Sequence, residues 1–481
     1  MPFNSLAFSI FIPLVFTLYW ILRPRPLILQ NGFLLLANYL FYGWWNWRFL
    51  FLIVTISSID FLAGRALAAT DDQARRKHLL VFTLCANLAI LGFFKYFGFF
   101  VESFRSSLQL IGLDLELRTI QVILPIGLSF YTFQALGYVI DCYQRKVAAT
   151  REVVPFFAYV SFFPQLVAGP IGRASQLLPQ FLTQRQFNSE EAKDGLRQML
   201  WGLFKKMVIA DNLVPVIETI YSDYTHYNGA ILLLGTLYFT IQVYCDFSGY
   251  SDIAIGTARL FGFRLMQNFA FPYFSRNMAE FWHRWHISLS TWFRDYLYIP
   301  LGGSRTTSTA RHLANLIVTF TVSGLWHGAD WTFIIWGFLH GLYYIPLVLS
   351  GRHKAFANTV AAGRLLPSLG EAMQMSTTFL LTLFAWIFFR ADSLAQATGI
   401  IGRVWSSNWL AAPPHDSSQL MHGIPYVVAL LVIEWLQREK QHALQIGALP
   451  VWARWISYYG LVLAIFFLSA TDHVPFIYFQ F

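Results

Sequence analysis

The chain has 481 residues, of which 56% are hydrophobic, 18% aromatic and only 12% charged, and its mean hydropathy is +0.49. Soluble globular proteins carry about 25% charged residues, so this composition excludes an ordinary soluble protein and indicates an integral membrane protein. The formal net charge of +9 comes from short basic clusters between apolar blocks. That distribution is typical of cytoplasmic loops beside membrane spans, and it does not indicate a nucleic-acid partner.

The N-terminal block MPFNSLAFSIFIPLVFTLYW has neither a basic n-region nor a small-residue cleavage site. We therefore expect a retained first span and not a signal peptide. The three cysteines are too few for a disulfide framework. Cys85 and Cys245 lie in apolar stretches, where a cysteine is by default a small buried hydrophobic residue.

Apolar blocks long enough to cross a bilayer recur along the whole chain. A span takes about 20 apolar residues, and the pattern predicts about 11 transmembrane helices. Several blocks are short or interrupted by Gly and Pro, so we expect some to be tilted, broken or re-entrant. The blocks lie near residues 5–22, 28–45, 49–68, 79–100, 121–141, 153–170, 229–247, 314–326, 330–349, 374–390, 424–437 and 452–470.

Basic residues alternate between the early loops. They cluster after the first, third and fifth blocks and are fewer in the loops between. Cytoplasmic loops carry the excess of Lys and Arg, so this alternation predicts an extracytoplasmic N-terminus. The clustered residues are Arg23, Arg25, Arg65, Arg75, Arg76, Lys77, Arg145, Lys146 and Arg151.

The segment 186–222 differs from its neighbours because charged residues interrupt its apolar pattern. Asn188 or Ser189 is a candidate N-cap, followed by two glutamates, and the apolar residues after it recur with helical period. This predicts an amphipathic helix over about 188–220, lying at the membrane surface or closing a cavity from the cytoplasm. A merely solvated face is the alternative. The residues expected on the basic face are Lys193, Arg197, Lys205 and Lys206.

Residues 282–297 combine histidine, arginine and tryptophan in one short stretch. As a helix, they would place an aromatic stripe on one side, with His283, His286, Ser290 and Arg294 on another. Ionisable residues at membrane depth are costly, so this polar face is a functional candidate facing a cavity. A helix at the membrane interface, where Trp and Arg are common, is the alternative. The stripe consists of Trp282, Trp285, Leu289, Trp292 and Tyr296.

The segment 319–341 places His327 and His340 in apolar, aromatic surroundings. Gly324 and Gly328 bracket Trp326 and His327, and Gly337 and Gly341 repeat the spacing. Small residues four apart let helices approach closely. A histidine on an apolar face is often only a core residue, and a second histidine-bearing segment nearby strengthens the functional interpretation.

A metal site built from His283, His286 and His327 is a weaker alternative. Zinc sites use three or four placed ligands, and HRWH lacks the H-E-x-x-H pattern, so we predict no metal. Nucleophile-elbow, phosphate-loop and C-x-x-C motifs are absent from the sequence. A histidine base acting on a substrate hydroxyl is chemically consistent with both segments. The residues alone thus indicate a membrane protein with a histidine-containing polar cavity.

Six motifs together give the chain a specific resemblance. It closely resembles the membrane-bound O-acyltransferase family, in particular its bacterial branch of alginate O-acetyltransferase-type proteins. The likeness covers essentially the whole chain, with core motifs over about 160–345 and C-terminal helices over about 370–481. It implies a single membrane domain over 1–481, all-α and polytopic, with helices around a central tunnel. The motifs are AGPIGR at 168–173, WGLFKKMVIADN at 201–212, YCDFSGYSDIAIGTARLFGF at 244–263, WHISLSTWFRDYLYIPLGGSR at 285–305, VSGLWHGADWTFIIWG at 322–337 and FAWIFFRADS at 384–393.

This resemblance implies acyl transfer from a cytoplasmic thioester to an extracytoplasmic hydroxyl. The near-invariant family histidine corresponds to His327, expected to act as the catalytic base. The second histidine of the branch corresponds to His286, expected to orient an intermediate or act as a second acid or base. His283 ranks below both. Candidate tunnel residues are Trp326, Trp285, Ser290, Arg294, Asp295 and Asp246.

The chain's last residues, PFIYFQF, resemble an aromatic–Tyr–aromatic motif of a small partner in the D-alanylation relatives. By that resemblance Tyr478 is a candidate acyl relay, and a packed aromatic terminus is the alternative. The family further implies acetyl-CoA as donor substrate without a tightly bound cofactor, a separate SGNH-type periplasmic acetyltransferase partner, and location in the bacterial inner membrane.

Within this interpretation the acceptor stays open among alginate, cellulose, peptidoglycan and other exopolysaccharides. A transporter or polymer-export component, and a structural scaffold, are the alternatives from other functional classes. Neither would need to consume a thioester.

Overall fold

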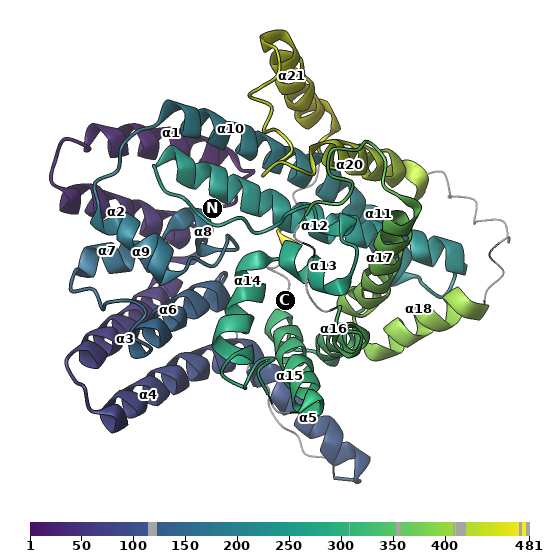
Figure 1. The fold of residues 1–481 in the computed structure, drawn as a ribbon, viewed down its shortest axis with the longest axis horizontal. Coiled ribbons are helices and arrows are strands. Elements are labelled where there is room, and N and C mark those ends of the chain that lie inside the picture. Colours follow the sequence, from purple (N-terminus) through teal and green to yellow (C-terminus); the bar gives the residue numbers. More distant parts are fainter. Residues whose placement is uncertain are drawn as a thin grey trace. The chain divides into compact units, whose positions relative to one another are not determined.

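The computed structural model describes residues 1–113, 123–306, 308–352, 356, 358–406, 409, 420–470 and 474–477. Across these residues the regular structure is helical and includes no β-strand, which confirms the all-helical fold class (Figure 1). The chain forms two compact units, Met1–Ala192 with Ala258–Leu265, and Lys193–Thr257 with Met266–Phe481. The expected organisation as one membrane domain stays a prediction.

Unit 1 is the N-terminal half of the chain. Local capping sets several helix starts: Ser5 accepts a hydrogen bond from the Phe8 amide, and Asp72 accepts one from the Ala74 amide. The helices are α1 Leu6–Ile21, α2 Leu27–Asn46, α3 Leu50–Ala68, α4 Gln73–Leu91, α5 Phe97–Leu110, α6 Leu128–Tyr143, α7 Val153–Val160, α8 Phe163–Leu166 and α9 Ala174–Leu182. A 3-10 turn, η1 Trp47–Phe49, joins α2 to α3, and a π-helix, η2 Gly92–Tyr96, joins α4 to α5.

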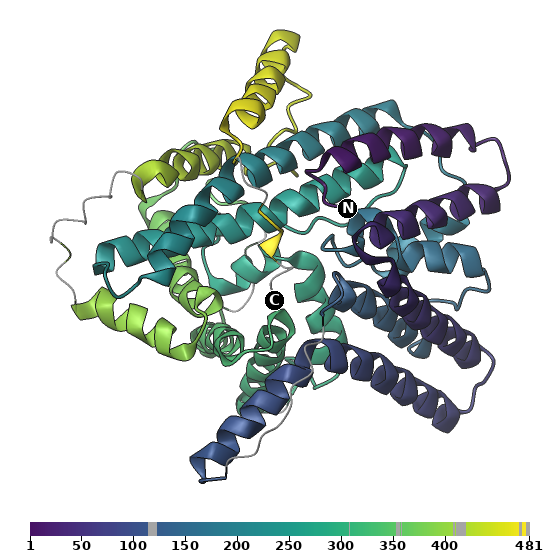
Figure 2. The same cartoon turned by 180° about the vertical axis from the view of Figure 1, so that it is seen from behind.

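Unit 2 contains the two histidine-bearing segments. Its helices are α10 Ser189–Leu203, α11 Asp211–Ser222, α12 Gly229–Leu260, α13 Met278–Arg284, α14 Ile287–Phe293, α15 Thr309–His327, α16 Trp331–Leu349, α17 Leu369–Arg390, α18 Leu394–Ser406, α20 Ile424–Gln437 and α21 Val451–Leu468. The short 3-10 and π elements are η3 Phe204–Ala210, η4 Pro272–Phe274, η5 Arg294–Tyr298 and η6 Met421–Gly423. Figure 2 shows the same ribbon from behind.

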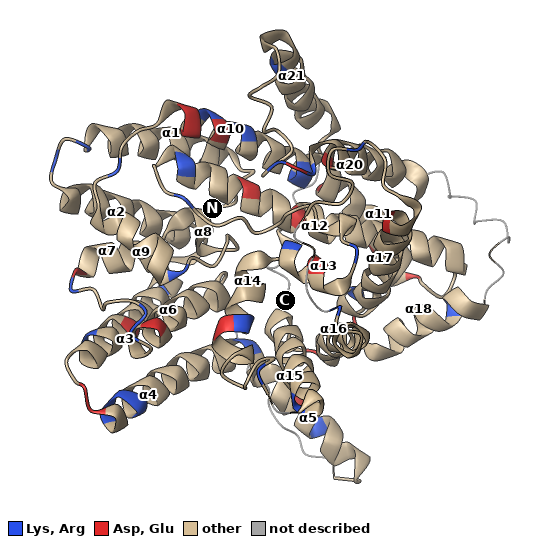
Figure 3. Ribbon diagram, in the orientation of Figure 1, with Lys and Arg blue, Asp and Glu red and all other residues tan. Residues whose placement is uncertain are grey.

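Long apolar helices agree with the predicted membrane protein. Six helical stretches of the described residues are long and apolar enough to cross a bilayer: Leu27–Ala68, Gln73–Leu110, Gly229–Leu260, Trp331–Leu349, Leu369–Arg390 and Val451–Leu468. Three shorter apolar stretches accompany them: Leu6–Ile21, Val153–Leu166 and Met421–Gln437. Charged residues are sparse on the ribbon (Figure 3). The chain is a multi-pass membrane protein, and the count of about 11 spans stays a prediction.

Three details differ from the apolar blocks of the sequence. The block 153–170 contains two short helices, α7 and α8, because the chain turns at residues 161 and 162. Helix α12 continues past the predicted end at 247, because the polar residues of its second half pack inside the protein and not against lipid. Cys85 is exposed and not buried, whereas Cys142 and Cys245 are buried.

Helical structure forms over the predicted amphipathic segment 188–220, but only part of its predicted basic face is correct: Lys193 is exposed and Arg197 half-buried, whereas Lys205 and Lys206 are buried. Asn188 caps it by accepting hydrogen bonds from the amides of Glu190 and Glu191. Lys205 and Lys206 are 2% and 7% exposed, so they face the interior of unit 2. Inside the unit they pair with carboxylates of α12, Lys205 with Asp252 and Lys206 with Asp246, each at 2.7 Å. A regular 3.6-residue period already places neither lysine on the face of Lys193 and Arg197.

Glycines allow α15 and α16 to pack against each other, as their spacing predicts. A Cβ atom on Gly324 would lie 2.2 Å from the carbonyl oxygen of Phe333, and one on Gly337 would lie 2.3 Å from that of Phe320. Backbone cannot yield as a flexible side chain can, so only glycine fits at either position. This close approach, visible between the two helices in Figure 1, fixes His327 at the end of α15.

Gly324→Ala is expected to destabilise the protein, because its new methyl group would overlap helix backbone. Overpacking of this kind costs about 1–3 kcal/mol in the free energy of unfolding. Gly460→Ala is the matched control, since a Cβ on that helical glycine meets no atom within 4 Å. Thermal unfolding in detergent should show a lowered midpoint for Gly324→Ala alone. Equal midpoints would show that the helices can separate without loss.

Candidate active site

The histidine-rich segment is not one continuous helix, contrary to the prediction for residues 282–297. Helix α13 ends at Arg284, Trp285 is extended, and His286 adopts a left-handed conformation with φ 42° and ψ 54° before α14 begins. Positive φ at a residue other than glycine costs on the order of 1–3 kcal/mol and occurs preferentially at functional sites. The backbone outlier therefore falls on one of the two predicted catalytic residues.

The break is made by a segment that lies earlier in the chain. The amide of Ile287 donates to the carbonyl of Asn268 at 2.9 Å, and the amide of Ala270 donates to the carbonyl of Arg284 at 2.9 Å. The side-chain oxygen of Asn268 also accepts from the Ser288 amide at 3.2 Å and from the Ser288 hydroxyl at 2.9 Å. These bonds replace the helical ones that residues 284–288 would otherwise make.

The break separates residues that a single helix would have aligned. His283 is exposed, with Nδ1 2.7 Å from the carbonyl oxygen of Ala279, whereas His286 is fully buried. The two histidines therefore do not share a helix face, and the continuous aromatic stripe is also wrong. Trp285 packs instead with the rings of Phe269 and Trp386, at centroid distances of 5.1 and 5.2 Å.

Asn268 fixes the protonation of the His286 ring. The nitrogen Nδ1 lies 3.2 Å from the Asn268 side-chain oxygen, which must be an acceptor because the Ser288 amide also points to it. Nδ1 therefore carries the proton, and in the neutral ring Nε2 carries the lone pair. Burial lowers the pKa of His286 to about 3, so the ring is neutral across the physiological range.

His327 lies close to His286, as the two predicted roles require. The two ring centroids are 6.5 Å apart. His286 is 0% exposed and His327 is 2% exposed. Trp326 lies beside both, 5.0 Å from His327 and 6.1 Å from His286. Trp336 and Phe389 complete the surroundings of His327 at 5.0 and 5.5 Å. An aromatic shell thus encloses the two imidazoles and excludes bulk water from them.

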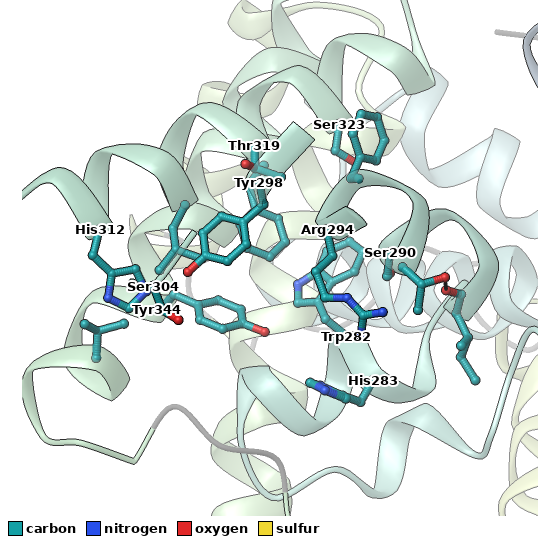
Figure 4. A pocket seen from close by; sticks show the side chains of 16 residues that line it. Trp282, His283, Ser290, Arg294, Tyr298, Ser304, His312, Thr319, Ser323 and Tyr344 are labelled. Atoms are coloured by element: carbon teal, nitrogen blue, oxygen red, sulfur yellow. Dashed lines mark hydrogen bonds between the residues drawn. The ribbon is translucent and has the colours of Figure 1, made fainter. Parts of the chain in front are cut away.

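A cavity of about 300 Å³ begins next to this pair. Its lining includes Ile287, which follows His286 in the chain, and Ser323, one helical turn before His327. The predicted cavity residues Ser290 and Arg294 also line it. Figure 4 shows Arg294 and His312 toward opposite ends of the lining, with Tyr298 between them. Asp295 is ion-paired with Arg294 at 2.8 Å.

A second cavity of about 400 Å³ lies beside a neighbour of His327, and neither histidine lines the first cavity or this one. Phe389, which packs on the His327 ring, lines it together with Phe333. The remaining lining is more polar than in the first cavity, and the C-terminal segment forms part of the wall. These further residues are Val214, Ile217, Glu218, Phe239, Gln242, Asp330, Thr332, Arg390, Ala391, Asp392, Val474, Pro475 and Ile477.

Asp246 is buried inside unit 2, but it belongs to an ion-pair cluster and not to the histidine pair. Its carboxylate lies 2.7 Å from Lys206 and accepts a hydrogen bond from the Ile477 amide. Tyr478, the candidate relay, lies outside the described residues. Sequence reasoning missed Asn268 and Lys206 as site residues. The motif FKKMVIADN contained the lysine, and its two-lysine run inside an apolar stretch was the available signal.

In the part of the chain that the structure describes, no three His, Cys, Asp or Glu side chains converge as metal ligands. A buried imidazole in this arrangement can exchange a proton, and its neighbours line two cavities. Acid–base chemistry on a substrate hydroxyl fits this arrangement.

Comparison with known proteins gives a consistent result. The model of the membrane-bound O-acyltransferase family matches residues 78–385. The probable alginate O-acetylase AlgI of Pseudomonas putida is 36% identical over the full length of both chains. Its counterpart in Azotobacter vinelandii is 38% identical over 84% of this chain and 78% of its own length. The peptidoglycan O-acetyltransferase of Helicobacter pylori is 31% identical over all of this chain and 97% of its own.

Proposed function

The chain belongs to the membrane-bound O-acyltransferase family, and on this premise we propose that it transfers acetyl groups across the membrane for O-acetylation of an extracytoplasmic polysaccharide. Family membership makes the chain an acyltransferase, which decides against the transporter and scaffold alternatives. The observation that carries the proposal is the buried pair His286 and His327, approached by two separate cavities. Neighbours of the pair line two separate cavities, which suits a donor and an acceptor that arrive from different sides.

The chemistry assigned to His327 is general base catalysis. Its neutral imidazole takes the proton of the attacking hydroxyl while the oxygen forms a bond to the acyl carbon. The carbon–sulfur bond of the thioester then breaks, and the imidazolium returns the proton to the leaving thiolate. His286, which has its lone pair on Nε2, serves as the second acid or base or orients the intermediate. The aromatic shell keeps water from competing as acceptor.

Acetyl-CoA is the proposed donor. The 300 Å³ cavity is lined by apolar side chains and hydroxyl groups, which suits the pantetheine arm of a coenzyme A thioester. Arg294, His283 and His312, which also line this cavity, would face the anionic part of that donor. In this proposal the cavity opens toward the cytoplasmic side. The protein lies in the inner membrane of a bacterium, with its N-terminus extracytoplasmic.

Acetyl-CoA turnover by the purified protein tests this function. The full chain in nanodiscs is given acetyl-CoA labelled on the acetyl group, and released CoA thiol and protein-bound label are both followed. Thioester consumption above that of empty nanodiscs supports the proposal, since transport would leave the thioester intact. If the protein releases no CoA even with polysaccharide and a periplasmic partner present, the proposed donor and reaction are wrong.

The acceptor of the first transfer is proposed to be the phenol of Tyr478. Three described residues just before it, Val474, Pro475 and Ile477, line the 400 Å³ cavity, and this is the observation behind the proposal. Tyr478→Phe removes only the hydroxyl group, so protein-bound label is expected to disappear while the protein stays folded. Persistent label on Tyr478→Phe would contradict the relay.

Delivery to the polymer is assigned to a separate SGNH-type periplasmic acetyltransferase. The acceptor proposed first is alginate, because the relatives with 36–38% identity are named for it. Peptidoglycan is the second candidate, because the relative named for it matches along the whole chain. Cellulose would be served by the same chemistry.

A further inference from the structure

The C-terminal segment Val474–Ile477 is held inside unit 2 by buried charged side chains. The Ile477 amide donates to a carboxylate oxygen of Asp246 at 2.7 Å. The ammonium group of Lys206 donates to the Val474 carbonyl at 3.2 Å. Asp246 is fully buried and Lys206 is 7% exposed, so both contacts lie away from water. Buried charges of this kind are costly unless they are paired.

Lys206 is the centre of this cluster. Its Nζ lies 2.7 Å from Asp246 on α12 and 2.8 Å from Asp211 at the start of α11. One cation on η3 thus joins α11 and α12, and it also donates a hydrogen bond to the segment Val474–Ile477. An ammonium group has three N–H donors, and Lys206 has three acceptors for them: Asp246, Asp211 and the Val474 carbonyl.

The chain before this segment is hydrogen-bonded to the same π-helix and to the start of α11. The Asn212 side chain donates to the Leu468 carbonyl at 2.7 Å, and the Ala470 amide donates to the Met207 carbonyl at 3.4 Å. Successive hydrogen bonds from α21 to Ile477 therefore involve residues 206–212 and Asp246. The segment is attached along its length and not at a single point.

The held segment lies between the candidate site and one of its cavities. On one side, the ring of Phe476 packs on Phe247 at 5.8 Å, and Phe247 packs on His286 at 4.5 Å. On the other, Val474, Pro475 and Ile477 line the 400 Å³ cavity that reaches Phe389 beside His327. A displaced segment would remove one wall of that cavity and uncover the aromatic shell.

We infer that Lys206, together with Asp246, is a positioning residue that holds Val474–Ile477 against the aromatic shell of the histidine pair. Its effect on turnover rests on the proposed function, whereas its hold on the segment does not. Lys205 provides a matched comparison within the protein. It is the adjacent residue and is equally buried, but it pairs with Asp252 at 2.7 Å and Ser248 at 2.8 Å, and both partners are on α12.

The experiment measures access to the tail through an introduced cysteine. Ile477→Cys keeps the backbone amide that Asp246 binds, and its side chain replaces one that is 5% exposed. Cys85→Ser removes the exposed native thiol, and Cys142 and Cys245 are buried. A polar maleimide is then reacted with this full-length protein in nanodiscs, with and without Lys206→Met or Lys205→Met. Labelling of position 477 is expected to be about 10-fold or more faster with Lys206→Met, the effect of losing hydrogen bonds to a charged group, and unchanged with Lys205→Met.

Turnover of acetyl-CoA in the same proteins provides the second readout. Lys206→Met is expected to lower kcat with little change in KM for acetyl-CoA, because the donor cavity is untouched. Equal labelling in all three proteins, equal acceleration by Lys205→Met, or faster labelling with unchanged kcat would each overturn the inference.

Labelling of Cys142 and Cys245 would reveal a variant that has not folded. In that case Lys206→Met with Asp246→Asn, which removes both side-chain charges at the tail, gives the same comparison. If the parent protein shows no turnover, the proposed function fails, and the labelling rates still decide whether Lys206 holds the tail.

Discussion

Replacing His327 by phenylalanine is expected to abolish acetyl transfer, lowering kcat by about 10²–10⁴-fold, the usual contribution of a general base. Phenylalanine preserves a planar ring among Trp326, Trp336 and Phe389 but can neither accept nor return a proton. The measurement is CoA release from acetyl-CoA by matched amounts of folded protein in nanodiscs. KM for acetyl-CoA should change little, because His327 exchanges protons only as the reaction proceeds and is not needed to bind the donor.

His340→Phe is the matched control for this substitution. His340 is also a fully buried histidine in the same unit, with Trp282 and Trp336 at centroid distances of 5.0 and 4.8 Å. Like His327 itself, it lines neither of the two cavities described above, so the two substitutions differ in the role assigned to the histidine and not in cavity lining. The same chemical change at this position should leave kcat within a few-fold of the parent value. Equal losses at both positions would mean that packing of the aromatic shell, and not proton transfer, explains the effect.

The sequence predicts much of the architecture around His327. The blocks 314–326 and 330–349 correspond to α15 and α16. The four-residue spacing of Gly324 with Gly328 and of Gly337 with Gly341 predicts the close contact of these helices correctly. Both features can be predicted from the sequence, because helical periodicity is a local property and because glycine, which has no side chain, marks positions where helices can approach closely. The resemblance assigns catalytic roles to both His286 and His327, and their ring centroids lie 6.5 Å apart. The roles themselves stay predictions.

The failures of sequence reasoning have one physical cause, which is competition from contacts distant in the chain. Residues 282–297 have helical periodicity, but Asn268 takes the hydrogen bonds that would continue the helix through His286. Lys205 and Lys206 lie in a segment predicted to be amphipathic, but carboxylates on α12 pair with both of them inside unit 2. Neither partner could be identified from the segment itself.

Asn268 is therefore the residue whose replacement should affect the site most after His327. Its side-chain oxygen holds both the ring of His286 and the first turn of α14, and its amide nitrogen donates to Ser251 at 3.1 Å. Asn268→Leu removes these contacts at nearly constant volume. Misplacing a catalytic group by about 1 Å costs on the order of 10²-fold in rate, and we expect kcat to fall by about that factor.

Asn268→Asp distinguishes loss of geometry from a change of proton affinity. The carboxylate can still accept from the Ser288 amide and from Nδ1 of His286, so the ring keeps its place and its tautomer. A negative charge beside the imidazole favours the protonated ring and raises the pKa of His286 from about 3. The neutral ring is the active form, so activity is lost as pH falls through that raised pKa. The acid limb of the kcat profile should thus move to higher pH in Asn268→Asp, while the activity well above it recovers toward that of the parent. A profile that keeps its shape and falls uniformly would show that Asn268 contributes only by packing, and that the charge state of His286 does not enter the reaction.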